Sequence, residues 1–416
     1  MPRDHSVRMI VGLVAGTVLG VTAHLLFTDS PALEAVVRYG TEPIGKIFLR
    51  LLFMLVIPLI VTALALGVAG LGDMRQLGRI GARTLAYTIV VSGIAVLLGV
   101  GLVNLIRPGE GLSPELRARL LATSRPVAPA AAASQASGVD FFVDLVPSNV
   151  VKAMTDGDML AVMVFSLFLG IGLALTRTEA ARRFEEALAG LYDVVMRLLD
   201  LVIGMAPIGV GCLLFTTTAR LGYDILAQLG SYVFVVLLAL GIQQFVVYSV
   251  AVWLGGMSPL YFFRGIREAM LTAFSTASSN ATLPTALRVA EDELHLPPHV
   301  SRFVLTIGST ANQNGTALFE GVTVLFLAQF YGVDLAFGQQ LTVVLICILG
   351  GIGTAGVPAG SIPVIAMILG MVGVPAEGIG MILGVDRFLD MCRTTLNVTG
   401  DLAAAVVVSR GEPGAP

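Results

Sequence analysis

The sequence predicts an all-α membrane protein with eight transmembrane helices and two re-entrant helical hairpins. Of its 416 residues, 56% are hydrophobic and only 13% are charged, and the mean hydropathy is +0.88. A soluble chain of this length would divide into domains that are each covered by polar side chains. The excess of apolar residues is therefore expected to face a lipid bilayer.

Eight apolar stretches are each long enough to cross about 30 Å of hydrocarbon. In chain order they cover residues 8–27, 40–72, 82–107, 158–176, 188–220, 226–254, 298–331 and 376–409. The first follows a short basic segment, as the apolar part of a signal peptide does. Its length and the lack of a clear small-residue cleavage site favour a true span.

Two further apolar regions, residues 258–292 and 336–374, are interrupted near their middles. Residues 275–284 and 350–363 are rich in small and turn-forming side chains, which do not support a continuous helix. Irregular backbone at membrane depth is tolerated only where it is buried in protein or lines a wet cavity. We therefore expect two re-entrant hairpins, each followed by a span with polar residues, in the manner of transporters with inverted repeats.

Clusters of arginine orient the chain, because short basic connections stay on the cytoplasmic side. The arginines in the connections expected there are Arg75, Arg79, Arg83, Arg177, Arg182, Arg183, Arg264 and Arg267. An even number of spans then places both termini in the cytoplasm, and residues 108–142 form an external loop. We expect a multi-pass protein of the cell inner membrane.

The last span carries a stripe of polar side chains. At about 100° per residue, Asp386, Asp390, Arg393, Asn397 and Asp401 project within an arc of about 80°. Ionisable groups at such depth are costly and normally face a water-filled path or each other. The stripe is either a structural ion-pair network or a binding site in which the planar fork of Arg393 holds a carboxylate.

A second polar cluster, residues 309–316, interrupts the seventh span and predicts local unwinding. Freed carbonyls beside Thr310, Asn312 and Asn397, together with the Asp401 carboxylate, would supply the oxygen ligands that a small cation needs. The alternative is that these side chains only join helices by hydrogen bonds.

Four motifs resemble those of the dicarboxylate/amino acid:cation symporter family, which includes excitatory amino acid transporters and archaeal sodium-coupled aspartate transporters. They are residues 278–284, 312–320, 353–358 and 393–401, and the resemblance covers nearly the whole chain after Lys46. It implies a homotrimeric symporter of acidic amino acids, driven by sodium and working by an elevator motion. The alternative is a proton-coupled symporter of C4-dicarboxylates or other amino acids in the same family.

The resemblance also divides the chain into a scaffold that holds the trimer together and a transport domain that moves. The scaffold comprises residues 1–81 and 143–220, and the transport domain comprises residues 82–107 and 221–409. Residues 108–142 form the external loop, and residues 410–416 form the C-terminal tail.

By the same resemblance, Arg393 binds the side-chain carboxylate of the substrate with help from Thr316. Asp390 binds the amino group, and Asn397 contacts the main-chain carboxylate. An acid opposite Arg393 favours aspartate or glutamate over a plain dicarboxylate. The remaining expected substrate residues are Thr394 and the hairpin tips Ser279, Asn280, Val357, Pro358, Ala359 and Gly360.

The resemblance implies sodium as a coupling ion at about two sites, with no other cofactor. The two expected ligand sets are Gly308, Asn312, Asn397 and Asp401, and Thr310 with the carbonyls of Gly351, Ile352 and Thr354.

A third cation site typical of the family departs from its pattern. Asn314 stands where an acid is usual, and Thr88 and Val91 stand where tyrosine and threonine ligands are usual, which leaves Ser92 and Asn312. A neutral pocket with few ligands compensates poorly for cation dehydration, so we expect the site to be absent or weak unless other oxygens rebuild it.

Glu320 lies one helical turn beyond Thr316, on the same face. It matches the glutamate that proton-coupled relatives use as a carrier. A buried carboxyl could take up a proton as the substrate loads, or it could simply be hydrogen-bonded between helices.

Other classes of function find little support. A net charge of -3 and the absence of basic runs argue against nucleic acid. The three cysteines and four histidines show no metal, disulfide or HExxH spacing, and an enzyme is not expected. Residues 398–401 resemble an intramembrane aspartyl protease motif but lack its first glycine. A channel fits less well than a carrier, because two closing hairpins and a carboxylate-binding arginine indicate occlusion.

Overall fold

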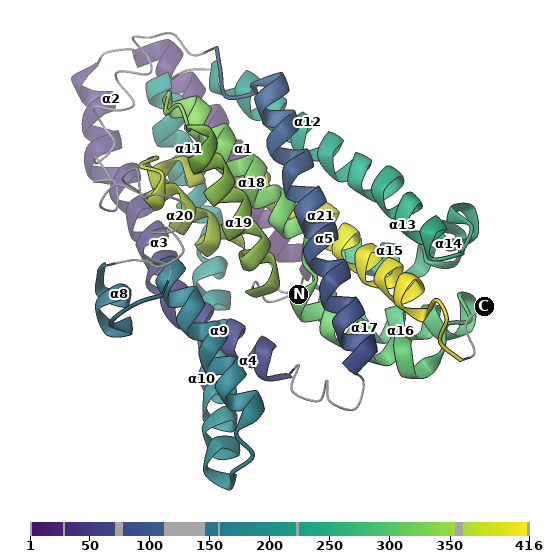
Figure 1. Cartoon of the computed structure of the whole chain (residues 1–416). Helices are drawn as coiled ribbons and strands as arrows, with labels where there is room; N and C mark the ends of the chain where they lie inside the picture. Colours follow the sequence, from purple (N-terminus) through teal and green to yellow (C-terminus); the bar gives the residue numbers. More distant parts are fainter. Residues whose placement is uncertain are drawn as a thin grey trace.

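The computed structural model describes residues 2–27, 30–70, 78–111, 146–156, 159–221, 224–353 and 361–413, and every regular element within them is helical (Figure 1). The helices of the first half are α1 Pro2–Phe27, α2 Pro31–Val36, α3 Glu42–Met54, α4 Val56–Gly70, α5 Gly78–Ile106, α8 Val150–Asp156, α9 Met159–Leu175, α10 Glu179–Gly204 and α11 Ala206–Leu221. Those of the second half are α12 Asp224–Ile242, α13 Tyr248–Leu254, α14 Pro259–Gly265, α15 Arg267–Thr276, α16 Ser279–Arg288, α17 Pro298–Ala311, α18 Asn314–Tyr331, α19 Phe337–Gly353, α20 Ser361–Met371 and α21 Ile379–Ser409. Short π-helical and 3₁₀ turns join some of them: η1 Val37–Thr41, η3 Gln243–Val247, η4 Val289–Glu293 and η5 Ala376–Gly378.

One group of helices contains α1, α3, α4 and α9 to α11. Helix α1 packs along α11, and α4 packs against α9 and α10. Glycine makes the first contact possible, because a Cβ on Gly12 or Gly16 would overlap the backbone carbonyls of Pro207 and Gly211. Small residues of this kind let helix backbones approach closely in a membrane, where packing and hydrogen bonds drive helix association.

The second group surrounds α21, which runs through the middle of the molecule (Figure 1). Helices α12, α13, α15, α17 and α18 all contact α21, and α5 packs along α18 and α19. The two groups meet where α21 lies against α11, with a Cβ on Gly380 or Gly384 placed 3.0–3.2 Å from side-chain atoms of Leu213 and Leu214. The polar stripe of α21 is thus enclosed by the second group.

The predicted break in the seventh span is confirmed. Helix α17 ends at Ala311 and α18 begins at Asn314. Between them Asn312 has φ −114° and ψ 61°, and Gln313 has φ −94° and ψ 60°, which are not helical values.

The first interrupted region forms two helices that pack against each other, α15 and α16. Ala277 ends α15 in the left-handed region at φ 50°, and the Ser278 side chain caps α16 by accepting from the N–H of Ala281. An ion pair between Glu268 and Arg288 joins the far ends of the two helices. In the second region α19 ends at Gly353 and α20 begins at Ser361, so the tip expected around Pro358 lies outside the described residues.

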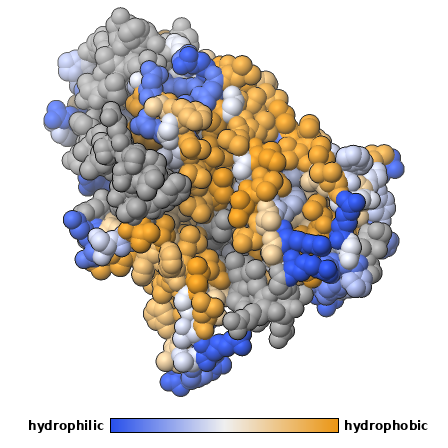
Figure 2. Space-filling model, in the orientation of Figure 1, coloured by the Kyte–Doolittle hydropathy of each residue, from blue (hydrophilic) through white to orange (hydrophobic). Residues whose placement is uncertain are grey.

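Among the described helices, two are long and apolar enough to cross a membrane by themselves, Arg79–Ile106 and Leu226–Leu254. Shorter apolar helices cover Val11–Phe27, Ile57–Leu66, Ala161–Leu175 and Phe337–Gly351. Figure 2 shows apolar residues over the middle of one face and hydrophilic residues gathered toward its ends.

The prediction that the clustered arginines lie in connections between helices is partly wrong. Arg79 and Arg83 lie in α5, Arg182 and Arg183 in the first turns of α10, and Arg264 and Arg267 in α14 and α15. Arg177 does lie between α9 and α10, and Arg75 lies outside the described residues. The helices extend past the apolar stretches because charged residues with good helix propensity continue them into water. The stretch 188–220 is also divided at Met205, between α10 and α11.

Candidate functional site

The polar stripe of α21 is buried along its whole length. Asp386, Asp390, Arg393, Asn397 and Asp401 are each no more than 7% exposed. Their spacing of three or four residues places them on one face of an unbroken helix, and the surrounding helices of the second group cover that face. Buried charges require partners, and the two halves of the stripe meet this requirement differently.

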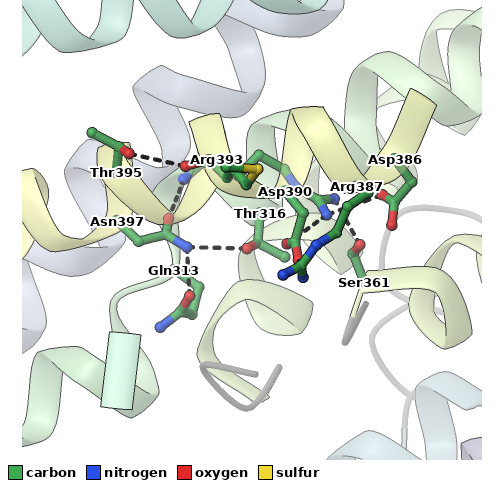
Figure 3. A network of polar contacts seen from close by, with 11 residues as sticks. Gln313, Thr316, Ser361, Asp386, Arg387, Asp390, Arg393, Thr395 and Asn397 are labelled. Atoms are coloured by element: carbon green, nitrogen blue, oxygen red, sulfur yellow. Dashed lines mark hydrogen bonds and ion pairs between the residues drawn. The ribbon is translucent and has the colours of Figure 1, made fainter. Parts of the chain in front are cut away.

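The first half is centred on the guanidinium of Arg393 (Figure 3). Its Nη2 donates to Asp386 Oδ1 at 3.0 Å and to Asp390 Oδ1 at 2.8 Å, and Nη1 donates to Ser361 Oγ at 2.7 Å. The guanidinium carbon also lies 3.8 Å from the ring centroid of Phe319, a cation–π contact. Nε is buried without an acceptor among the described residues. Arg393 is therefore oriented by two carboxylates whose place a ligand carboxylate can take.

Asn397 joins α21 to the break between α17 and α18. Its Oδ1 accepts from the N–H of Gly315 at 2.7 Å (Figure 3). Its Nδ2 donates to Thr316 Oγ1 at 3.2 Å and also to Gln313 Oε1. Thr394, beside Arg393, is 5% exposed. The structure thus brings Asn397 and Thr316 together, one to two turns along α21 from Asp390 and Arg393.

The second half of the stripe ends at Asp401. Asn312 Nδ2 donates to Asp401 Oδ1 at 2.9 Å, and the Oδ1 of Asn312 is buried with no donor in the part of the chain that the structure describes. A Cβ on Gly308 would lie 2.5 Å from Asp401 Oδ1, so the backbone of α17 contacts this carboxylate directly. An anionic oxygen with one donor, beside an amide oxygen without a donor, has the chemistry that a hard cation such as Na⁺ requires.

The other expected cation set is described in part. Thr310 is half-buried near the end of α17. The carbonyl of Gly351 accepts from the N–H of Gln313 at 3.3 Å, which places the end of α19 beside the break in the seventh span. Ile352 continues the backbone of α19, and Thr354 lies outside the described residues.

At the third expected cation site, hydrogen bonds between uncharged side chains connect three helices. Ser92 Oγ donates to Asn314 Oδ1 at 2.6 Å, and Asn314 Nδ2 donates to Tyr248 Oη at 3.2 Å. Thr88 and Val91 are buried nearby on α5, at 4% and 5% exposure. Both ends of the Asn314 amide are thus hydrogen-bonded to uncharged side chains.

Glu320 is fully buried on α18. A Cβ on Gly350 would lie 3.0 Å from its Oε2, so the carboxylate lies against the backbone of α19. The glutamate is therefore placed between the seventh span and the second interrupted region.

The residues expected at the hairpin tips are less closely connected to Arg393. Ser279 is 2% exposed, and its Oγ has no hydrogen-bond partner within the described residues; Asn280 is exposed. Val357, Pro358, Ala359 and Gly360 lie outside the described residues.

Sequence reasoning missed several residues of the site, because their contacts come from other helices. The missed residues are Gln313, Ser361, Phe319, Tyr248 and Arg387. Gln313 lies in the break of the seventh span, and Ser361 lies in the second interrupted region. Their positions in the sequence could therefore have indicated that they belong to the site. Nothing in the sequence singles out Phe319 or Tyr248.

The sequence model of the sodium:dicarboxylate symporter family matches residues 6–411. The chain belongs to this family. It is 35% identical over 407 residues to the proton/sodium-glutamate symport protein of Bacillus subtilis, covering 97% of this chain and 92% of the relative. It is 32% identical to mouse excitatory amino acid transporter 2, covering 96% of this chain and 77% of the relative. It is also 32% identical to the C4-dicarboxylate transport protein of Rhodospirillum rubrum, covering 98% of this chain and 88% of the relative.

The predicted family membership is thus confirmed, and the family makes the chain a membrane transport protein rather than an enzyme.

Proposed function

We propose that the chain is a secondary active symporter of aspartate and glutamate, driven by sodium. The observation that carries this proposal is the arrangement along α21, where Arg393 shares one nitrogen between Asp386 and Asp390. Two turns further on, the Asp401 carboxylate receives one hydrogen bond within the described residues. One helix thus presents a fork for an anion and an oxygen cluster for a cation.

Substrate binding would exchange the partners of Arg393. The side-chain carboxylate of aspartate takes the guanidinium bidentately, with Thr316 beside it. Asp390, displaced from Arg393, accepts the substrate ammonium, and Asn397 contacts the main-chain carboxylate. The name of the Bacillus subtilis relative, a proton/sodium-glutamate symport protein, supports this substrate class.

Coupling would use about two sodium ions per substrate. One would take oxygens of Gly308, Asn312, Asn397 and Asp401, and the other Thr310 with carbonyls at the end of α19. The neutral Ser92–Asn314–Tyr248 network argues against a third ion. Sodium binding would order the break at Asn312 and Gln313, which also carries the bonds to Asn397. In this way the ion would prepare the substrate half of α21.

Glu320 would add proton coupling. Its carboxyl is fully buried on α18, against Gly350 of α19. Protonation would then accompany substrate loading, and the proton would be released on the cytoplasmic side.

The transport motion would be an elevator. The group around α21, within residues 82–107 and 221–409, would move against the group of α1, α3, α4 and α9 to α11, which would also form a homotrimer. Eight helices would span the inner membrane with both termini in the cytoplasm, and α15–α16 and α19–α20 would be re-entrant hairpins whose tips close over the ligand.

A second candidate is transport of C4-dicarboxylates. The Rhodospirillum relative carries that name, and Arg393 would bind either ligand. Asp390 opposes this candidate, because a second ligand carboxylate without an ammonium group would meet a carboxylate.

The test is uptake of labelled aspartate by the purified full-length protein in proteoliposomes, with sodium, proton and potassium gradients varied one at a time. We expect uptake that requires inward sodium and that unlabelled glutamate inhibits more strongly than succinate. Uptake that ignores the sodium gradient, or stronger inhibition by succinate than by glutamate and aspartate, contradicts the proposal.

A further inference from the structure

Helix α21 carries a second arginine, Arg387, beside the part of the stripe around Arg393 and Asp390. It has no role in the function proposed above. Arg387 Nη1 lies 3.9 Å from Asp390 Oδ2, on the carboxylate oxygen that Arg393 does not use. Its side chain is 25% exposed, and its Nε is buried without an acceptor in the described part of the chain. Figure 3 shows its guanidinium extending alongside Asp390.

The side of α21 that carries Arg387 offers it little else to bind. Gly380, Gly384 and Arg387 follow one another at helical spacing, and the glycines lie against Leu213, Leu214 and Leu13 of the first group. These neighbours are apolar. The carboxylate of Asp390 is the acceptor within 4 Å of Arg387 among the described residues, and the charge of Asp386 also interacts with Arg387 electrostatically.

The pair matters when a ligand enters. A ligand carboxylate that takes the fork of Arg393 separates Asp390 from that guanidinium, and the charge of Asp390 then needs another cation. Aspartate and glutamate bring one in their ammonium group. Succinate, with the same two carboxylates and no ammonium, brings none, and a buried carboxylate left unpaired is strongly unfavourable.

We propose that Arg387 is a specificity-determining residue that neutralises Asp390 whenever no ligand ammonium does so, and thereby lets C4-dicarboxylates bind to the amino acid site. The inference rests on the proposed placement of the substrate at Arg393 and Asp390. The two groups are 3.9 Å apart, so Arg387 can approach as Asp390 leaves Arg393. In this arrangement the ligand ammonium and Arg387 compete for one carboxylate.

The test compares how well succinate and aspartate compete with labelled aspartate for uptake by the reconstituted full-length protein. In the unaltered protein we expect succinate to compete, more weakly than aspartate. In Arg387→Gln the inhibition constant of succinate should rise about fivefold relative to that of aspartate, the upper end of what a partly exposed charge pair contributes. Arg387→Lys should keep the ratio near that of the unaltered protein.

Two further variants separate this role from a merely structural one. Arg264→Gln removes the same charge from the exposed arginine of α14 and should leave the ratio unchanged. Asp390→Asn removes the carboxylate that Arg387 neutralises, so adding Arg387→Gln to it should change the ratio by less than about twofold. The double variant also tests the idea if Arg387→Gln alone folds poorly, because Asp390 is then not left charged without Arg387.

Failure of the inference differs from failure of the proposed function. An equal change for both ligands in Arg387→Gln, or no competition by succinate in the unaltered protein, overturns the role of Arg387 alone. Unaltered aspartate uptake in Arg393→Gln overturns the substrate site on which the inference rests.

Discussion

The two halves of the α21 stripe both consist of buried polar side chains, and they differ in how their charges are paired. Around Arg393, one guanidinium has two carboxylates, a hydroxyl and an aromatic face. Around Asp401, one carboxylate has a single amide donor, and the neighbouring Asn312 oxygen has none in the described residues. The carboxylates of the first half are paired with a cation, whereas no cationic side chain among the described residues pairs with Asp401.

This difference explains how one helix can couple an anion to a cation. In the proposed exchange at Arg393, a ligand carboxylate pairs with the guanidinium and the ligand ammonium pairs with Asp390. A cation bound at Asp401 would relieve the deficit there. Asn397 lies between the two and holds the break through Gln313, Gly315 and Thr316, so filling the cation half would stiffen the substrate half.

The largest effect should come from removing the fork. Arg393→Gln leaves Asp386 and Asp390 buried without their shared cation, and aspartate uptake should fall on the order of 100-fold or more. Initial uptake rates in proteoliposomes measure this. Arg393→Lys keeps the charge without the planar fork and should recover sodium-dependent stabilisation against heat but not uptake. Near-normal uptake in either variant would contradict the assignment of the Arg393 half of the stripe to substrate binding.

The next effect should come from the cation half. Asp401→Asn removes the charge that attracts sodium, and the sodium concentration for half-maximal uptake should rise about tenfold or more. The matched control is Asp386→Asn, the same change in the substrate half. Its sodium-induced rise in Tm without substrate should stay as in the unaltered protein. Equal losses of sodium binding in both variants would show that the halves are not distinct.

A smaller effect is expected from Gly308→Ala. Its Cβ would lie 2.5 Å from Asp401 Oδ1, so the carboxylate must shift, at a cost of about 1–3 kcal/mol. Sodium affinity should fall severalfold, with a matching drop in the sodium-induced Tm shift. Gly241→Ala on α12, where a Cβ meets nothing within 4 Å, is the control and should behave normally. A normal sodium response in Gly308→Ala would place the ion elsewhere.

The smallest expected effect on the uptake rate comes from Glu320→Gln, which mimics the protonated carboxyl. If Glu320 takes up a proton with the substrate, uptake by the unaltered protein decreases as pH rises, since the ionised form must first be protonated. The variant is permanently neutral, so its uptake should not vary with pH. Proton entry measured with an internal pH dye should also disappear, and persistent proton entry in Glu320→Gln would exclude this residue as the carrier.

The sequence predicted most of what lies on one helix. Spacing alone placed Asp386, Asp390, Arg393, Asn397 and Asp401 on one face of α21, because helical periodicity is a local property. The break at Asn312 and Gln313 was predictable for the same reason, since its polar residues interrupt an apolar run.

Contacts between helices were not predictable in this way. The bonds from Arg393 to Ser361 and from Asn314 to Tyr248 join residues 32 and 66 positions apart, and helical periodicity does not say which helices pack together. Arg387 was overlooked because its position beside the stripe is evident only when Asp390 is seen with one oxygen on each arginine.

The central claim is that one helix couples an acidic amino acid to sodium. The most direct test is simultaneous uptake of labelled aspartate and labelled sodium into proteoliposomes under a fixed membrane potential. The account predicts that about two sodium ions enter with each aspartate, and that Asp401→Asn lowers this ratio. Accumulation of aspartate without sodium entry would contradict it.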